Sequence, residues 1–533
     1  MSIIKSLRRL IRRNKNSRQE QLPHCDTFTQ WQDEKIKKSY SANIKLIKKV
    51  FENCDDMVFR EVILAGDKRL ALFYIEGLTD RDSISSGILH PLLLELNKLN
   101  IQPEYAALKD RLITEGEVSE VKGFAPAIRA ILSGDVVLLL EGASRGIVVS
   151  LRAWEARNVE EPMTESVIRG SREGFTETLR INTSLLRRRI ISPNLKIESM
   201  VLGHYSNTDL AICYIQDLVD PGILAEVKKR LERIDLEGVL DSGYIEELIE
   251  DNPYSIFPSF ISTERPDKVA GALLEGRISI IVNNSPFALI LPVVFAMFFA
   301  SPEDYYSRFM ISSIKRFLRY ISFFLSLASP AFYVAITTYH HDMIPTPLLI
   351  SLSAQREGVP FPASLEALLM TIVFEILLEA GLRMPRPYGQ AISIVGALII
   401  GEGAVNAGLV SAAMVIVIAI TAIASLTFPN PNIADGITKF RFVLLFLASI
   451  AGLYGIVMGL FFLLTYLNSL RSFGIPFLSP AAPYSKNLFK DTLIRMPWWQ
   501  LNQRRSVNQP INSEGREQKT KPEPGRGGGA DQG

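Results

Sequence analysis

The chain has 533 residues, of which 47% are hydrophobic and 21% charged, with a formal net charge of +2. So small a net charge argues against a nucleic-acid partner, and three cysteines without CxxC or Cys/His spacing argue against a disulfide framework and a structural zinc. Apolar residues gather between about 286 and 470, which predicts a charged N-terminal part followed by a membrane part.

The two ends of the chain read as cytoplasmic segments. Residues 1–45 form a basic extension that begins MSIIKSLRRLIRRNKNSRQ and has no apolar stretch behind it, whereas a secretory signal peptide needs one. Residues 476–533 carry a positive excess and finish in a run rich in Gly, Pro and Lys. We expect this tail to be cytoplasmic and disordered at its end, because it has little to bury.

The charged part contains an internal repeat. LALFYIEGLTD (70–80) aligns without gaps with LAICYIQDLVD (210–220), and ILSGDVVLLLEGASRGIVVSL (131–151) matches LLEGRISIIVNNSPFALILP (273–292). Each half reads as strands separated by a helical stretch. We therefore predict two similar α/β subdomains, 46–157 and 196–292, the alternative being chance similarity between short buried strands.

The connector between them, 158–195, contains the charged stretch EPMTESVIRGSREGFTE (161–177) and then a predicted helix. No nucleophile, histidine or metal cluster accompanies it, and its glycine spacing fits neither a phosphate loop nor a dinucleotide fingerprint. We therefore expect no catalytic residue, cofactor or metal here. Its predicted role is assembly or coupling, with the candidate residues Glu161, Pro162, Glu165, Arg169, Gly170, Arg172, Glu173 and Gly174.

The membrane domain, 293–475, is predicted to be α-helical and to cross the membrane about four times, which makes the fold class mixed. Lys315, Arg316 and Arg319 precede the first span and favour a cytoplasmic N-terminal side. As one helix, the third segment would reach about 57 Å, too long for a single crossing. The predicted spans are 320–339, 365–382, 391–428 with a break near 402, and 442–467. Residues 286–300 are too short for a span and read as a strand that passes into an interfacial helix.

Acidic residues within this domain are the pore or gating candidates. Thr371, Glu375, Glu379 and Arg383 recur every four residues, so they form one stripe on a helix. Ionisable groups at membrane depth are costly and usually face a bundle interior or water, so a ring of such stripes would attract cations. The alternative is an interfacial helix with Glu379 paired to Arg383.

A second candidate site lies in the third predicted span. Gly401, Glu402 and Gly403 mark the expected break of that long apolar segment, and Glu402 is its one charged residue between 391 and 428. We count these three residues with the pore or gating candidates.

Several motifs together resemble the A subunit of the GerA-type spore germination nutrient receptors. These are EPMTESVIRGSREGFTE and LRINTSLLRRRI in the connector, LEGVLDSGYIEELIED (236–251), FFASPEDYYSRF (298–309) and SAQREGVPFPASLEALLM (353–370), and the resemblance covers roughly residues 40–505. Two places differ from the family pattern: Ser171 stands where the family usually has Pro, and Asn283-Asn284-Ser285-Pro286 where it usually has Asp-Gly-Thr-Pro.

The resemblance implies a multi-pass protein of the inner spore membrane. It implies a transporter-like B subunit that binds the nutrient, a lipoprotein C subunit, and assembly of the A subunit, as a pentamer, into a nutrient-gated cation channel. A secondary transporter for a small nutrient or ion is the rival function, although the repeat found here lies in the charged part and not in the membrane part. A membrane-tethered enzyme would lack a site.

Overall fold

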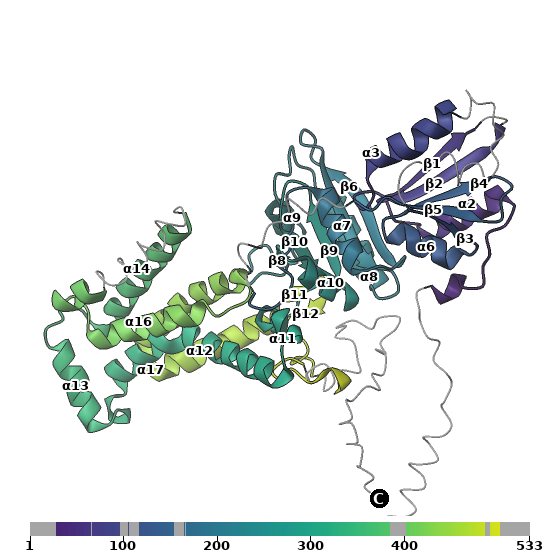
Figure 1. The fold of residues 1–533 in the computed structure, drawn as a ribbon. Coiled ribbons are helices and arrows are strands. Elements are labelled where there is room, and N and C mark those ends of the chain that lie inside the picture. The colour runs from purple at the N-terminus through teal and green to yellow at the C-terminus, as the bar shows by residue number, and fades with distance from the viewer. Residues whose placement is uncertain are drawn as a thin grey trace, which may run out of the picture. The chain divides into compact units, whose positions relative to one another are not determined.

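The structure is a computed structural model (Figure 1) that describes residues 28–64, 67–95, 105, 117–153, 162, 165, 167–383, 401–484 and 491–500. The chain divides into two compact units, Met1–Ala156 with Thr183–Glu198, and Arg157–Asn182 with Ser199–Gly533. It passes between them within helix α7 (Leu179–Arg189) and strand β6 (Leu195–Leu202).

The first unit is built on a five-stranded antiparallel sheet with the order β1-β2-β4-β5-β3. Its strands are β1 (Met57–Ile63), β2 (Arg69–Ile75), β3 (Glu117–Val121), β4 (Val136–Leu140) and β5 (Gly146–Ser150). Successive side chains of a strand point to opposite faces. Ala71 and Phe73 accordingly pack with helices α2 (Tyr40–Val50) and α6 (Phe124–Leu132) on one face, whereas Leu70 and Leu72 join a second core on the other.

Three short helical segments follow β2: α3 (Arg81–Ser83) and two π-helical turns, η3 (Ile84–Leu89) and η4 (Pro91–Glu95). The two π-helical turns contribute side chains to the second core. A short 3-10 helix, η1 (Thr29–Trp31), precedes α2. Because both faces of the sheet are covered, its three interior strands, β2, β4 and β5, are apolar on both sides. This explains why the sequence around 70–75 reads as an unbroken apolar run.

One ion pair in this unit is fully buried. Arg187 donates from Nε and Nη2 to the two carboxylate oxygens of Asp56, at 2.7 and 2.8 Å, and neither side chain is more than 5% exposed. The main-chain oxygen of Leu195 accepts from Nη1 at 2.9 Å. A bidentate arginine–carboxylate pair fixes geometry as well as charge, so this contact orders the end of the predicted connector within its unit.

The second unit begins with a sheet of the same strand plan, in the order β6-β7-β9-β10-β8. Its remaining strands are β7 (Thr208–Ile215), β8 (Ile261–Thr263), β9 (Ile278–Val282) and β10 (Ala288–Leu291). Helices α8 (Pro221–Leu231), α9 (Ser242–Ile249) and α10 (Pro266–Leu274) accompany it. The two runs that align in the sequence, 70–80 and 210–220, supply the second strand of each sheet.

Matching glycines show why the two sheets turn alike. Gly134 follows α6 and Gly276 follows α10, and they adopt φ of +91° and +85°. A β-carbon at these positions would lie 2.8 Å from the carbonyl oxygen of Leu78 and 2.5 Å from that of Leu218. Only glycine tolerates both this conformation and this approach. Asp80 and Asp220, which end the aligned runs, likewise both cap the helix that follows.

After β10 the chain enters a helical part, 295–469. It contains a 3-10 helix, η6 (Phe295–Phe299), then α11 (Glu303–Tyr306), α12 (Phe309–Tyr339), η7 (His341–Met343), α13 (Thr346–Arg356), α14 (Ala363–Arg383), α16 (Ala412–Ser425) and α17 (Pro431–Ser469). Among the described residues, α12 and α17 are long and apolar enough to cross a membrane by length and composition, and α16 is a shorter apolar helix. A small hairpin, β11 (Arg471–Ser472) and β12 (Ile475–Pro476), and a 3-10 helix, η8 (Trp498–Gln500), follow.

Helix α17 reverses direction in its middle. Gly452 has the non-helical φ of 59° and ψ of −137°. A β-carbon on Gly459 would collide with Leu444, although these residues are 15 positions apart and would be about 22 Å apart in a straight helix. The hydroxyl of Tyr339 donates to the carbonyl oxygens of Ser449 and Ile450, at 2.7 and 3.0 Å. The expected single span at 442–467 is therefore a pair of antiparallel segments.

The third predicted span also differs from the expectation. Residues 401–406 are helical, and the chain turns at 407–411, where Gly408 has a φ of +66°. The break therefore lies several residues after Gly401-Glu402-Gly403, because the positive-φ turn falls at Gly408. Residues 384–400, where this span was expected to begin, lie outside the described residues.

Candidate functional site

The acidic stripe predicted on α14 is paired within the helical part. Arg441 of α17 donates from Nη1 to Glu375 at 3.2 Å and from Nε to the carbonyl oxygen of Ser326 in α12 at 2.6 Å. The Arg441 side chain is 2% exposed and that of Glu375 30%. Thr371 is buried and donates to Ala367 of its own helix at 2.7 Å. The fixed positive charge of Arg441 therefore balances the negative charge of Glu375. No pattern in the sequence predicts this pair.

The other pore candidates lie on exposed surfaces. Glu379, one turn after Glu375, is exposed, and so is Glu402 in the helical stretch 401–406. Gly401 and Gly403 belong to the same stretch. The alternative that pairs Glu379 with Arg383 cannot be followed, since the Arg383 side chain lies outside the described residues.

A second acid of α14, which was not a candidate, is completely buried. Glu366 accepts at Oε2 from the main-chain nitrogen and the hydroxyl of Ser411, both at 3.0 Å. Its Oε1 lies 3.5 Å from Nε of Arg356, and its side chain is 0% exposed. Both residues belong to the quoted motif 353–370, so the signal available in the sequence was an acid ten residues after an arginine in an apolar setting.

The connector motif, 161–177, is tied to the second sheet through Glu165. This carboxylate is buried and accepts from the Thr263 hydroxyl at 2.5 Å and from Nζ of Lys268 at 2.6 Å. Arg265 donates from Nη1 to the carbonyl oxygen of Glu165 and from Nη2 to that of Ser171, both at 3.2 Å. Charge-assisted hydrogen bonds of this kind hold a loop without regular secondary structure in one conformation.

The remaining motif residues divide by burial. Pro162 and Gly174 are buried, whereas Arg169, Gly170 and Arg172 are exposed and Glu173 is half-buried. Gly170 has a φ of +150°, and a β-carbon there would lie 3.0 Å from the ring of Tyr306. Glu161 lies outside the described residues.

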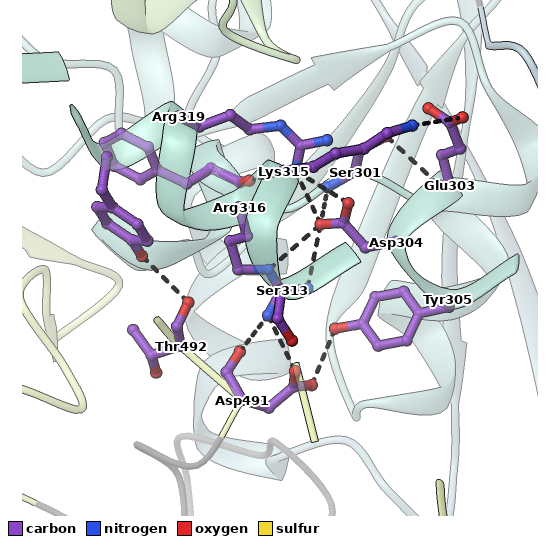
Figure 2. A network of polar contacts seen from close by, with 12 residues as sticks. Ser301, Glu303, Asp304, Tyr305, Ser313, Lys315, Arg316, Arg319, Asp491 and Thr492 are labelled. Atoms are coloured by element: carbon purple, nitrogen blue, oxygen red, sulfur yellow. Dashed lines mark hydrogen bonds and ion pairs between the residues drawn. The ribbon is translucent and has the colours of Figure 1, made fainter. Parts of the chain in front are cut away.

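A further polar network surrounds the start of α12 (Figure 2). Asp304 accepts from Nε and Nη2 of Arg316, at 3.2 and 3.1 Å, and from Nη1 of Arg319 at 2.8 Å. Asp491, which precedes η8, accepts from Arg316 Nη1 and from the Tyr305 hydroxyl, both at 2.9 Å. We call these five residues the junction network. Two arginines and two aspartates balance their charges away from water.

The junction network joins three segments that are distant in the sequence. Tyr306, beside Tyr305, donates to Asp267 of α10 at 2.9 Å. Lys315, Arg316 and Arg319 were interpreted as markers of membrane orientation, and the sequence offered no sign that Arg316 also binds a residue 175 positions later. The network therefore ties the C-terminal segment to the base of the first apolar helix, and Tyr306 beside it adds a contact to α10.

The second sheet and the loop that precedes β8 also hold both ends of α17. The Tyr466 hydroxyl accepts from the main-chain nitrogen of Ile256 at 3.0 Å, and Asn432 donates to Ser262 at 2.8 Å. Ser472, just after α17, accepts from the main-chain nitrogen of Val293 at 3.0 Å. Movement of this sheet would therefore act on both halves of α17 as well as on α12.

Electrostatics in the second sheet single out one carboxyl group. Burial, with the nearby carboxylates of Glu250 and Asp241, raises the pKa of Glu246 in α9 to about 7. Burial likewise raises the pKa of Glu250, which accepts from Ser259. Among the described residues, no group of three His, Cys, Asp or Glu side chains is placed to hold a metal ion.

Comparison with known proteins identifies the family to which this chain belongs. A family model described as the Bacillus/Clostridium GerA spore germination protein matches residues 45–507. The chain is also 44% identical over 496 residues to spore germination protein KA of Bacillus subtilis (strain 168), covering 92% of this chain and 91% of that protein. The chain belongs to the GerA family of spore germination proteins.

Two further proteins are similar to this chain. An uncharacterized membrane protein of Bacillus subtilis (strain 168), YfkQ, is 43% identical over 489 residues, covering 92% of this chain and 95% of that protein. The crystal structure of the N-terminal domain of the A subunit of the Bacillus megaterium spore germinant receptor GerK3 is 34% identical, covers 49% of this chain and 98% of that one, and superposes with a TM-score of 0.40. Family membership and the two apolar helices indicate a membrane protein with an α/β N-terminal part.

Proposed function

We propose that this chain is the A subunit of a spore germination nutrient receptor, a multi-pass protein of the inner spore membrane with both termini in the cytoplasm. It works with a transporter-like B subunit that binds the nutrient and with a lipoprotein C subunit, and it carries out no chemical step of its own. The observation that carries the proposal is the family match over residues 45–507, which spans both the α/β and the helical parts.

Copies of the chain assemble, as a pentamer in this proposal, around a cation path that opens when the nutrient binds. The support from the structure is the charge in the helical part, where Glu375 and Glu379 lie one turn apart on α14. Arg441 neutralises Glu375 in the described conformation. Opening would therefore exchange Arg441 for a permeating cation at Glu375, because a carboxylate at membrane depth needs one partner or the other.

The junction network is the proposed route by which the second sheet acts on α12. Arg316 and Arg319 lie in the first turns of that helix and are bound by groups outside it. A shift of α11 or of the segment at Asp491 would pull on the helix through charged hydrogen bonds. In this proposal the exposed connector residues Arg169 and Arg172 and the half-buried Glu173 contact a neighbouring subunit.

The experiment removes this chain from spores of its own host and follows cation release after nutrients are added singly. The proposal predicts that release in response to one nutrient disappears and returns when the gene is restored. Release that is unchanged for every nutrient contradicts the receptor role. Saturable uptake of a nutrient by liposomes that contain this chain alone would favour the transporter alternative.

A further inference from the structure

A cavity of about 200 Å³ opens at the end of the helical part where α12 ends and α14 begins. The space a water molecule takes in the liquid is about 30 Å³, so the cavity is large enough for a small organic molecule and too small for a drug-sized one. Its wall combines α12, η7, α13, α14 and α17. The polar residues on it are Thr337, Thr338, His341, Arg356, Ser364 and Ser449.

Arg356 is held in this wall by a buried acid. Its Nε lies 3.5 Å from Oε1 of Glu366, and both atoms are buried without a hydrogen-bond partner. Glu366 is itself fixed by Ser411. The Arg356 side chain is 25% exposed, and its Nη1 and Nη2 atoms make no hydrogen bond to any described residue. The planar fork that arginine uses for bidentate recognition of an anion is therefore oriented but unused.

Two hydroxyl groups on the wall are set up as acceptors. The Thr337 hydroxyl donates its hydrogen to the carbonyl oxygen of Tyr333 at 2.8 Å, and that of Ser449 donates to Phe446 at 2.7 Å. Their lone pairs remain for a donor group, because a hydroxyl has one hydrogen to give and two lone pairs. The cavity lining thus includes both a guanidinium group and hydroxyl acceptors.

We propose that this cavity binds a small carboxylate that also carries a hydrogen-bond donor, such as an amino acid or a hydroxy acid. The carboxylate bonds to Nη1 and Nη2 of Arg356, and the ammonium or hydroxyl group donates to Thr337 or Ser449. The simpler alternative is that Arg356 serves only as the counter-charge of Glu366. A distance of 3.5 Å from Nε leaves the rest of the guanidinium unexplained.

This site goes beyond the proposed function, since binding is measured on the chain whether or not it conducts ions. The purified full-length chain in detergent micelles is dialysed against radiolabelled glycine or lactate, with acetate, glycinamide and inorganic phosphate as competitors. Glycine or lactate should bind saturably. Acetate should compete more weakly and glycinamide least, because the first lacks the donor and the second the carboxylate.

Two variants test the position of the site by different means. Arg356→Lys keeps the charge beside Glu366 but removes the fork, and should weaken binding about tenfold or more. Thr338→Phe, at an exposed position on the cavity wall, should block the cavity without changing its charge. Gln355→Ala, an exposed neighbour on α13, is the matched control and should bind like the wild type.

The proposal is overturned if the wild type binds neither glycine nor lactate, or if both variants bind as well as the control. Competition by glycinamide as strong as that by glycine would exclude carboxylate recognition. Preference for inorganic phosphate over both labelled acids would replace the assigned ligand class. If Arg356→Lys does not fold, the Thr338→Phe result decides alone.

Discussion

Replacing Asp304 with asparagine should destabilise the chain far more than replacing its neighbour Glu303 with glutamine. Asp304 is 1% exposed and faces two guanidinium groups, Arg316 at 3.1 Å and Arg319 at 2.8 Å. An amide removes, in a buried place, the carboxylate that pairs with Arg319 and one of the two that pair with Arg316, the other being Asp491. Breaking a buried pair by removing one partner costs about 3–5 kcal/mol, which lowers the ratio of folded to unfolded chain more than a hundredfold.

Glu303 supplies the matched control for this change. It pairs with Lys315 at 3.3 Å, and the Lys315 side chain is 40% exposed, so loss of that pair should cost about 1 kcal/mol or less. Unfolding of the purified chain in mild detergent is followed against denaturant by tryptophan fluorescence. Trp498 is a local probe, because its ring lies 5.7 Å from that of Tyr305. Equal shifts of the denaturant midpoint for Asp304→Asn and Glu303→Gln would show that the buried Asp304 pairs contribute no more to stability than the Glu303 pair.

Three further predictions concern pH, assembly and topology. Because the pKa of Glu246 is raised to about 7, the folded state keeps a proton that the unfolded state releases near the ordinary carboxyl value. The free energy of unfolding should therefore fall as pH rises from about 4.5 to about 7. Glu246→Gln should flatten this slope in denaturant titrations, and an unchanged slope would exclude Glu246 as its source. Glu165→Gln should lower the denaturant midpoint of unfolding, because Glu165 is buried against Lys268. Arg169→Ala, at an exposed position, should leave that midpoint unchanged and reduce co-purification of subunits. The opposite pattern would contradict the assigned roles. In a background without reactive native cysteines, Met343→Cys should be labelled from outside intact cells and Tyr205→Cys should not. Both positions are well exposed. External labelling at position 205 would reverse the proposed orientation.

The α/β part could be predicted from the sequence because its signal is local. Each sheet is covered on both faces, so its central strands read as apolar runs, and the aligned runs end in aspartates that cap the next helix. Gly134 and Gly276 stand at the same place in the two aligned segments, just after a helix, and the structure gives both a positive φ. Strand order and register depend on pairing between distant segments, and these had to come from the structure.

The candidate site was harder to predict, because helical periodicity shows which residues share a face but not what that face meets. Glu375 was found as part of a stripe, yet its partner Arg441 lies 66 positions away on another helix. Glu366 was missed because a single buried acid leaves no repeating pattern. The reversal at Gly452 was missed for a different reason: glycines are common in apolar helices, and the positive φ that ends a helix cannot be read from composition.

The proposed function makes this GerA-family chain the subunit through which cations pass. The most direct measurement is cation flux through liposomes that contain the chain with the proposed B and C subunits, before and after nutrient is added. A double variant, Glu375→Gln with Glu379→Gln, keeps side-chain shape but removes both charges. We expect nutrient-dependent flux for the wild type, and reduced flux and cation selectivity for the variant at equal assembly. Flux and selectivity that are identical in the two, or no flux in the complete complex, would contradict it.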